Sequence, residues 1–383
     1  MLHRNYFFIL FLPFFVFTYC KGDKSENKDL TELAAQNNNS YATGFNVEQQ
    51  SIGKILSITN PWPKSDKSYK YLLLTQEEAV KSTFNKDAYD GIITVPVERI
   101  VVTSTTHIPA LELLDVEHTL VGFPGTDYVS SEKTRVRIDN KAIRELGKNE
   151  GINTEVLLEL QPELVVAFGV DGTNKSMATI EKTGIPVIYN GDWVEASPLA
   201  KAEWLKFFGA LYNKEKQADS IFQRIETDYL NAKAIAAKAT NKPTVLCGAM
   251  YKDIWYLPSG TSPEAQFLKD ANTNYLWHAT EEAGSLALSF EAVYEKAKDA
   301  QIWLSPSYYG SYQALEASNE HYTKFDAFRN KNIFTFSNTT GATGGVTYYE
   351  LGTARPDLVL KDMIKICHPQ LLINYDTTFF KPL

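Results

Sequence analysis

Two stretches of the chain, residues 153–166 and residues 289–302, carry acidic side chains at the same spacing. Each begins with a capping Asn or Ser and has a Glu two places later (Glu155 or Glu291). A second Glu and a further acid follow at four-residue steps, and then an apolar run. Asn and Ser side chains accept from the first N–H groups of a helix, and the helix dipole favours an early carboxylate. Each copy therefore predicts a capped helix leading into a buried strand, one in each half of the chain. This repeat suggests two lobes with something between them, although early Glu residues are also frequent in other α/β proteins.

Histidine and serine residues offer other chemistries. Ser104 lies close to His107, but the chain has no Gly-x-Ser-x-Gly elbow, no Walker loop and no Gly-x-Gly-x-x-Gly loop. A bare zinc ion needs three or four converging ligands. The candidate histidines are scattered: His107, His118, His278, His321 and His368. We therefore expect no enzyme, no cofactor and no protein-bound metal centre. Capture of a free zinc- or manganese-type ion stays open as an alternative.

Charge and cysteine content narrow the class of protein further. The formal net charge is −8, whereas nucleic-acid binding requires clustered Lys and Arg, so we expect no nucleic-acid partner. With 383 residues and 44% hydrophobic content, the chain is long enough for two cores. Only Cys247 and Cys367 lie beyond the N-terminal segment, so neither a disulfide framework nor a cysteine metal site is indicated. We expect both to be small buried residues.

The N-terminus predicts export. Arg4 precedes an apolar stretch that ends at Tyr19 and is shorter than the roughly 20 residues of a membrane span. Cys20 follows, and the sequence then becomes polar. The arrangement resembles a bacterial lipoprotein signal, which implies a signal peptide over residues 1–19, lipid on Cys20 and a tether over residues 20–43. A signal cleaved elsewhere, leaving Cys20 unmodified, is the alternative. In both cases we expect an exported protein, and with the lipid one anchored in the periplasm to a bacterial membrane.

The remaining sequence predicts an α/β protein with a β extension. Residues 44–96 contain two strand-like runs around a turn rich in proline, and we expect a small N-terminal β extension there. From residue 97, short apolar runs alternate with segments of helix length, which predicts central parallel sheets with crossover helices. The predicted strands of the first lobe are Arg99–Thr103, Thr119–Gly122, Leu164–Phe168 and Pro186–Tyr189.

A long helix is predicted between the two lobes. Residues 214–241 contain no Pro or Gly, and their apolar residues recur at helical spacing. Such a helix would be about 40 Å long. We therefore expect a first lobe over residues 97–213, one rigid interlobe helix over residues 214–241, and a second lobe over residues 242–383. A rigid connection of this kind predicts that the lobes move little relative to each other.

Several strings, in their order along residues 97–370, resemble one family. They are Arg99–His107, Asn153–Val166, Gly184–Ile188, Ala202–Phe208 and Leu288–Glu291. The chain resembles substrate-binding lipoproteins of ABC importers, in the long-helix class (class III) of periplasmic binding proteins that take up iron–siderophore complexes, haem and cobalamin. The extension with Asn60–Trp62 is similar to a lipoprotein branch of this family. The segment Gly344–Glu350 departs from that branch, which usually has a more polar sequence there, and this difference concerns the ligand more than the fold.

The resemblance implies a transport function. The protein would capture a ferric siderophore, or a related metal complex such as haem or cobalamin, and deliver it to an ABC permease dimer in the inner membrane. In this family an exposed Glu on each lobe docks onto permease arginines, and the matching residues are Glu155 and Glu291. We expect a monomer. A surface lipoprotein that hands its ligand to an outer-membrane receptor is an alternative that would not need these two residues.

The ligand is expected between the lobes, outside the carboxyl ends of the parallel strands. Loops after the strands supply mainly aromatic candidates, whose flat faces and polar edges suit a macrocycle or a catecholate complex. The candidate residues are Thr105, Thr106, His107, Trp193, Tyr251, Trp255, Tyr308, Tyr309, Tyr348 and Tyr349. For each aromatic residue, burial in a lobe core is the competing interpretation.

Overall fold

The computed structural model describes residues 39–172 and 174–383, which belong to one compact unit. The predicted signal peptide, Cys20 and almost all of the predicted tether lie outside the described residues. Within the described part of the chain, no helix combines the length and the apolar character needed to cross a membrane.

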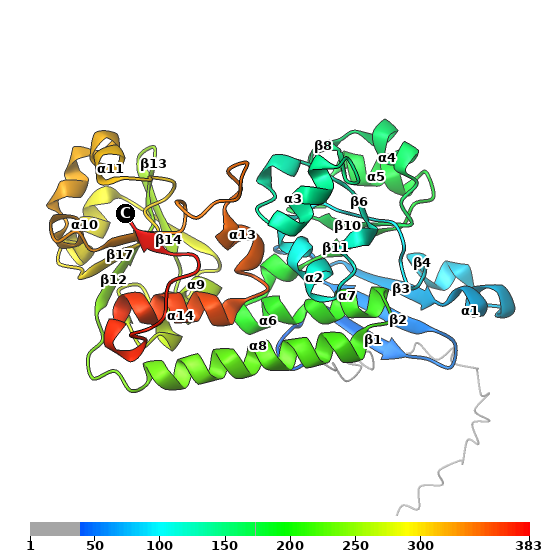
Figure 1. Cartoon of the computed structure of the whole chain (residues 1–383), viewed down its shortest axis with the longest axis horizontal. Coiled ribbons are helices and arrows are strands. Elements are labelled where there is room, and N and C mark those ends of the chain that lie inside the picture. The colour runs from blue at the N-terminus through cyan, green and yellow to red at the C-terminus, as the bar shows by residue number, and fades with distance from the viewer. Residues whose placement is uncertain (1–38, 173) are drawn as a thin grey trace, which may run out of the picture. The chain divides into compact units, whose positions relative to one another are not determined.

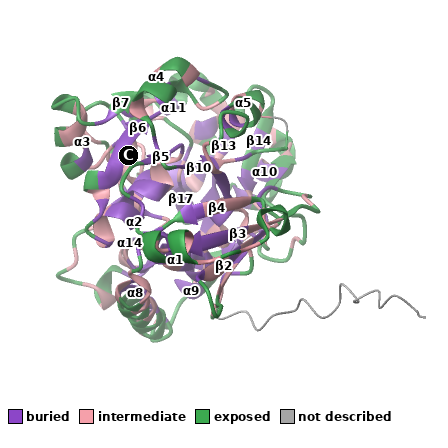
Figure 2. Cartoon of the chain, turned by 90° about the vertical axis from the view of Figure 1, so that its right-hand side faces the viewer, coloured by how far each residue is buried: buried purple, intermediate pink, exposed green. Residues whose placement is uncertain are grey.

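The N-terminal extension is a four-stranded sheet with the order β1-β2-β3-β4. The first three strands are antiparallel, and β4 returns parallel to β3 after helix α1. The elements are β1 Phe45–Gln49, β2 Lys54–Thr59, β3 Ser68–Leu74, α1 Gln76–Lys81 and β4 Gly91–Thr94. The two predicted strands are confirmed as β2 and β3. Their buried side chains join the core of the first lobe, whereas α1 buries no residue (Figure 2).

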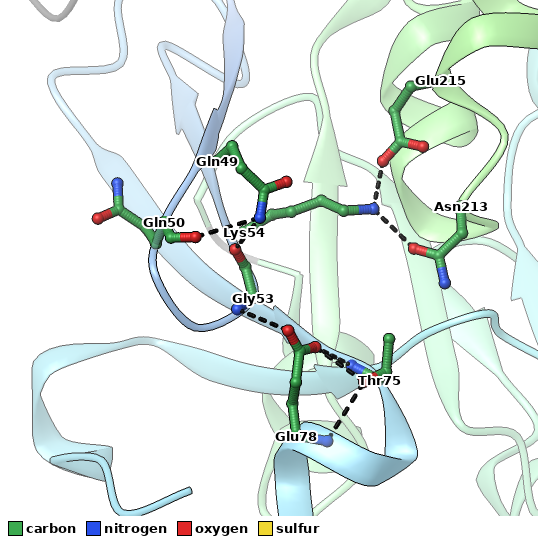
Figure 3. A network of polar contacts seen from close by, with 8 residues as sticks. All are labelled: Gln49, Gln50, Gly53, Lys54, Thr75, Glu78, Asn213 and Glu215. Carbon is green, nitrogen blue, oxygen red and sulfur yellow. Dashed lines mark hydrogen bonds and ion pairs between the residues drawn. The ribbon is translucent and has the colours of Figure 1, made fainter.

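A polar network holds the β1–β2 turn in place (Figure 3). Lys54 donates from Nζ to Oδ1 of Asn213 at 2.6 Å and pairs with the Glu215 carboxylate in the first turn of the long helix. The Glu78 carboxylate accepts from the backbone N–H of Gly53 at 3.1 Å and closes the capping box of α1. The extension is therefore linked by side chains to the start of the long helix.

A five-stranded parallel sheet forms the centre of the first lobe, in the order β11-β10-β5-β6-β7. The strands are β5 Ile100–Val102, β6 Leu120–Phe123, β7 Arg144–Glu145, β10 Leu164–Phe168 and β11 Val187–Asn190. Between them run α2 Ile108–Leu113, α3 Glu132–Asp139, α4 Thr154–Leu160 and α5 Lys175–Glu181. The predicted strands of this lobe are confirmed. Their continuous apolar runs are typical of parallel strands covered on both faces, whereas β7 has only two exposed residues and gave no such signal.

The second lobe has a sheet in the order β15-β12-β17-β18-β19, in which β19 alone is antiparallel. The strands are β12 Thr244–Cys247, β15 Asn274–Tyr275, β17 Ile302–Leu304, β18 Ile333–Thr335 and β19 Lys381–Pro382. Helices α9 Pro263–Asp270, α10 Phe290–Ala297, α11 Tyr312–Ser318 and α14 Pro356–Cys367 accompany them. A second, antiparallel sheet consists of β13 Ala249–Tyr251, β14 Ile254–Pro258 and β16 Ser285–Leu288.

The two lobes repeat one strand order. Apart from the edge strands β7 and β19, the sheets read β11-β10-β5-β6 and β18-β17-β12-β15, which is fourth, third, first and second in chain order in both lobes. The helices of the repeated acidic pattern, α4 and α10, each lead into the third strand of their sheet. Asn153 and Ser289 cap these helices by accepting from the N–H three residues later. The predicted pair of capped helices is therefore confirmed, at equivalent positions of the two sheets.

The long helix α8 (Glu215–Ala236) contributes to both cores. Its first half packs with the first lobe through Ala218, Ile221, Phe222 and Ile225. Its second half packs with the second lobe through Tyr229, Ala232 and Ala236. It contacts α14 and α7 (Leu205–Leu211), beneath which it runs in Figure 1. The helix has 22 residues and ends five residues before the predicted limit.

Residues 40–44 are bound to the first lobe and not extended as a tether. The Glu203 carboxylate accepts from the backbone N–H groups of Ser40, Tyr41 and Ala42 at 2.9, 2.7 and 2.8 Å. The Glu195 carboxylate likewise accepts from the N–H of Gly44 at 2.8 Å. The polar composition of this segment suggested solvent exposure, but buried carboxylates supply its partners, so the predicted tether boundary at residue 43 lies too far along the chain.

Candidate functional site

A cavity of about 210 Å³ lies at the carboxyl ends of β12 and β17 in the second lobe. Open α/β sheets place their ligand sites at this end of the strands. Apolar and sulfur-containing side chains make up most of its wall. The lining residues are Cys247, Gly248, Pro258, Glu264, Leu268, Leu304, Ser305, Phe336, Tyr348, Tyr349, Met363 and Phe380.

A second cavity, of about 170 Å³, is lined by residues of both lobes. Thr106, Pro198 and Lys201 come from the first-lobe side. The other lining residues are Pro263, Glu264, Phe267, Tyr348, Tyr349, Gly352, Thr353 and Pro356. Since Glu264, Tyr348 and Tyr349 line both cavities, the two adjoin each other, and we call the pair the cleft.

Two opposite charges face the cleft from different elements. Lys201 lies on helix α6 (Pro198–Glu203), and Glu264 lies in the first turn of α9. Both side chains are half-buried, and neither makes a hydrogen bond or an ion pair within residues 39–172 and 174–383. The cleft therefore presents one cationic and one anionic group that are available to a ligand.

Tyrosine rings form the wall that the two cavities share. Tyr348 stacks on Phe336 with ring centroids 4.4 Å apart and an interplanar angle of 8°. Tyr349 is 44% exposed, and the Tyr308 hydroxyl donates to its hydroxyl oxygen at 3.3 Å. Burial raises the pKa of Tyr348 and Tyr349. The Tyr308 hydroxyl adds to the shift of Tyr349, and the Glu264 carboxylate adds to both to a lesser extent. These phenols therefore stay protonated at neutral pH and offer ring faces and O–H groups, not phenolate ligands.

A buried polar cluster lies behind the first-lobe wall. Thr106 Oγ1 donates to Asp192 Oδ2 at 2.9 Å and contacts Ser104 Oγ at the same distance. Asp192 is 3% exposed, and burial raises its pKa to about 6, opposed by the hydrogen bond from Thr106. Its Oδ1 atom and the Nδ2 atom of Asn190 have no partner in the described part of the chain. The cluster fixes Thr106 and keeps an easily protonated carboxyl next to the cleft.

The structure brings together part of the predicted ligand set. Thr106, Tyr348 and Tyr349 line the cleft, Tyr308 contacts Tyr349, and Thr105 begins the turn that contacts the helix carrying the two tyrosines. The other aromatic candidates line neither cavity. Trp193 packs on Phe168 in the first lobe, Tyr309 packs on Tyr322, and Tyr251 projects from β13 with 68% exposure.

Two predicted ligand residues lie in the cores instead. His107 is fully buried against Phe208, and burial lowers its pKa to about 3. Trp255 is also fully buried, stacked on Trp303. In β14 the inward positions alternate with outward ones, and this alternation places Trp255 inside and Tyr256 outside. The prediction for these two residues is therefore corrected: His107 and Trp255 are core residues and not part of the cleft wall.

Several lining residues were not predicted. Lys201 and Glu264 lie on helices and not in loops after strands, so a search of strand ends misses them. For Glu264 the sequence did contain a usable pattern. Ser262 and Pro263 precede it and are typical of the start of a helix, so Glu264 could have been placed in a first helical turn. Cys247 and Cys367 are buried free thiols, as expected, but Cys247 also lines the cleft.

Two other cavities do not lie at the carboxyl ends of the parallel strands. One of about 520 Å³ is bordered by Lys242 and Asn274, which lie at the amino ends of β12 and β15. Another, of about 390 Å³, lies between the extension and the first lobe. Among the described residues, no group of three or more His, Cys, Asp or Glu side chains is arranged to hold a metal ion.

The repeated acids occupy the surface. Glu155 and Glu291 are both exposed in the first turns of α4 and α10. Neither carboxylate makes a hydrogen bond or an ion pair in the part of the chain that the structure describes, and neither lines the cleft. Their neighbour Glu159 differs, because Arg144 lies 3.9 Å from it.

Comparison with known proteins gives a family match. A family model described as periplasmic binding protein matches residues 100–340. An uncharacterized lipoprotein of Methanocaldococcus jannaschii is 27% identical over 385 aligned residues, covering 91% of this chain and 90% of the relative.

Solved structures share the fold at lower identity. CeuE of Helicobacter pylori with Ni(II) bound superposes with a TM-score of 0.54 at 19% identity, covering 74% of this chain and 88% of that one. An ABC transporter substrate-binding protein from Listeria monocytogenes gives 0.51 at 20% identity, covering 71% of this chain and 99% of that one. Identities in this range establish similarity of fold.

Proposed function

The chain belongs to the periplasmic binding protein family, and we propose that it is the substrate-binding component of an ABC importer. It captures a ferric siderophore or a related metal chelate, such as haem or cobalamin, and delivers it to a permease dimer in the inner membrane. The observation that carries this proposal is the cleft. One of its two adjoining cavities lies at the carboxyl ends of β12 and β17, the other is lined from both lobes, and Tyr348 and Tyr349 line both.

The chemistry of the cleft supports a chelate as the ligand. Stacked tyrosine rings bind flat organic surfaces, and protonated phenols donate hydrogen bonds to chelate oxygens. Lys201 supplies the positive charge that an anionic chelate or a propionate group requires. Capture of a bare zinc- or manganese-type ion is the second candidate, in which Glu264 would be the nearest anionic ligand.

The exposed acids support delivery to a permease. Glu155 and Glu291 occupy equivalent positions in two lobes of the same strand order, outside the cleft. We propose that they dock onto arginines of the two permease subunits. Charge pairs of this kind chiefly orient and accelerate association.

Membrane attachment is proposed through Cys20. The polar sequence after Cys20 and the lipoprotein relative support a lipid anchor on an exported protein, which we propose to be a monomer. Passing the ligand to an outer-membrane receptor is the alternative, and it requires the cleft but not the two acids.

Isothermal titration calorimetry of the purified protein tests the ligand class. The panel is haem, cobalamin, a ferric catecholate, a ferric hydroxamate, Zn²⁺ and Mn²⁺. We expect one chelate to bind and the free ions not to bind. Tyr349→Ala should weaken that binding at least tenfold, because it removes an exposed ring of the cleft wall.

Tyr251→Ala is the matched control, since this exposed tyrosine lines neither cavity. Equal losses in the two variants would place the ligand outside the cleft. Binding of Zn²⁺ or Mn²⁺ with no response to any chelate would replace the proposal with the free-metal alternative.

A further inference from the structure

The segment that supplies the cleft tyrosines also reaches across to the other lobe. Thr340 and Val346 pair as an antiparallel bridge, and the N–H of Gly341 donates to the carbonyl of Gly345 at 2.8 Å. This hairpin continues directly into helix α13 (Thr347–Leu351), which carries Tyr348 and Tyr349. We call residues 339–350 the clasp.

The clasp is bound to the first lobe at its helical end. The Glu350 carboxylate, 2% exposed, accepts from the backbone N–H groups of Ser130 and Ser131 at 2.6 and 2.9 Å. Ser131 is the N-cap of α3, so the carboxylate lies where the helix dipole favours a negative charge. One buried charge thus joins α13 of the second lobe to α3 of the first.

The hairpin tip makes further contacts with the same loop. Thr343 Oγ1 donates to the carbonyl of Asp127 at 2.8 Å, and Arg135 donates to Thr343 Oγ1 at 3.4 Å. A Cβ on Gly345 would lie 2.1 Å from the carbonyl oxygen of Tyr128. The backbones are therefore packed so closely that only glycine fits there.

The cleft is small while the clasp is docked. Cavities of about 210 and 170 Å³ are each below the roughly 300–1,000 Å³ of typical small-molecule sites. Tyr348 and Tyr349 belong to both linings, so a shift of α13 would merge and widen the two spaces. A chelate the size of haem therefore requires α13 to move.

We propose that the clasp is a gate on the cleft and that Glu350 is a positioning residue, which holds the two tyrosines over the cavity by anchoring α13 to Ser130 and Ser131. Release of the hairpin from the first lobe admits the ligand, and redocking retains it. This inference deepens the proposed function and rests on it for the identity of the ligand, but the gate can be tested without any ligand.

Cys247 is a native reporter of the gate, because this residue lines the cavity and is buried. Cys367 is equally buried on α14 but does not line the cavity, so it reports opening of the lobe core. We would measure iodoacetamide labelling of both thiols by peptide mass spectrometry in the full chain. Hydrogen exchange at the amides of Ser130 and Ser131 would be followed in parallel.

The variants are Glu350→Ala, which removes the acceptor, and Gly345→Val, which undocks the hairpin without altering a cleft residue. Gly151→Val is the control, since a Cβ at Gly151 meets no atom within 4 Å. We expect labelling of Cys247 to rise at least tenfold in both variants, with Cys367 unchanged, and faster exchange at Ser130 and Ser131. The control should match the wild type.

Three results would overturn the gate. Unchanged labelling of Cys247 while Ser130 and Ser131 exchange faster would show that an undocked clasp does not open the cleft. Amides that stay protected in both variants would show that these contacts do not hold the clasp. Equal acceleration at Cys247 and Cys367 in both variants would mean that the clasp only stabilises the lobe. Failure of every chelate to bind would instead refute the proposed function and leave the thiol result intact.

Discussion

Thr106 Oγ1 donates a hydrogen bond of 2.9 Å to Asp192 Oδ2, although the two residues are 86 positions apart in the chain. The bond joins the segments that follow β5 and β11, and it places an almost fully buried carboxyl directly behind a residue of the cleft wall. The chemistry of the cleft therefore depends on a group that a ligand does not need to touch.

Asp192→Asn should change how stability depends on pH. Burial raises the pKa of Asp192 from 3.8 to about 6, so its stabilising contribution is present below pH 3.8 and is lost as the pH rises through 6. That loss is about 3 kcal/mol for a shift of this size. Relative to the wild type, the variant should gain about 2.4 kcal/mol in free energy of unfolding between pH 4 and pH 7.5, measured by urea unfolding. The exposed control Asp66→Asn should show no such gain, and equal profiles for the two variants would contradict the prediction.

His107→Leu should stabilise the protein and leave ligand affinity unchanged. Both ring nitrogens of His107 are buried without a partner in the described structure, and burial lowers its pKa from 6.5 to about 3. The contribution of this lowered pKa to stability is present above pH 6.5 and is lost as the pH falls, by about 3 kcal/mol at pH 4. The free energy of unfolding of the variant should be about 1 kcal/mol higher than that of the wild type at pH 7. It should also fall less as the pH is lowered. The control is His118→Leu, which changes an exposed histidine. If the His107→Leu protein is stable but no longer binds the ligand, the prediction is wrong and His107 belongs to the ligand site.

Glu203→Ala should release the N-terminal segment. The Glu203 side chain is fully buried, accepts from three backbone N–H groups of residues 40–42 and pairs with Lys206 Nζ at 2.9 Å. Removing it leaves these donors without an acceptor, which should lower the free energy of unfolding by about 3 kcal/mol or more. Limited proteolysis should then cleave around residue 40. Glu226→Gln, which alters only a bond from the Tyr41 hydroxyl, should have an effect below about 1 kcal/mol.

Local patterns predicted the scaffold of this protein well. Continuous apolar runs gave the buried strands of the first-lobe sheet, and the capping residues Asn153 and Ser289 gave the helices of the repeated acidic motif. The helical spacing of Ile221, Phe222 and Ile225 gave the long helix. Each of these patterns involves residues that are close together in the sequence. Such a pattern arises whenever one face of a helix or strand is buried.

The cleft was predicted only in part, because it depends on contacts between distant segments. Lys201 and Glu264 face one cavity only after two helices pack together, and no sequence spacing reports that packing. His107 has a polar side chain, yet its neighbours, including Phe208, place it in the core. The docking of Glu350 onto Ser130 joins residues 220 positions apart. Trp255 lies in the run Ile254–Pro258, whose residues are apolar throughout, so the sequence does not show which of them point inward; the structure buries Trp255 and Leu257.

The most direct test of the transport account is a double charge reversal on the surface. Glu155→Lys with Glu291→Lys should leave the affinity for the bound chelate within about twofold, since neither residue lines the cleft. Transport by proteoliposomes containing the permease should fall at least tenfold, because lysines would then face the permease arginines. Each single reversal should give an intermediate loss.

The matched control is Glu159→Lys with Glu295→Lys, which makes the same charge change one helical turn further along each helix. The account predicts near-normal transport by this control and loss of transport by the first pair, at equal chelate affinity. Full transport by the Glu155→Lys, Glu291→Lys protein, or equal losses in the two double variants, would contradict it.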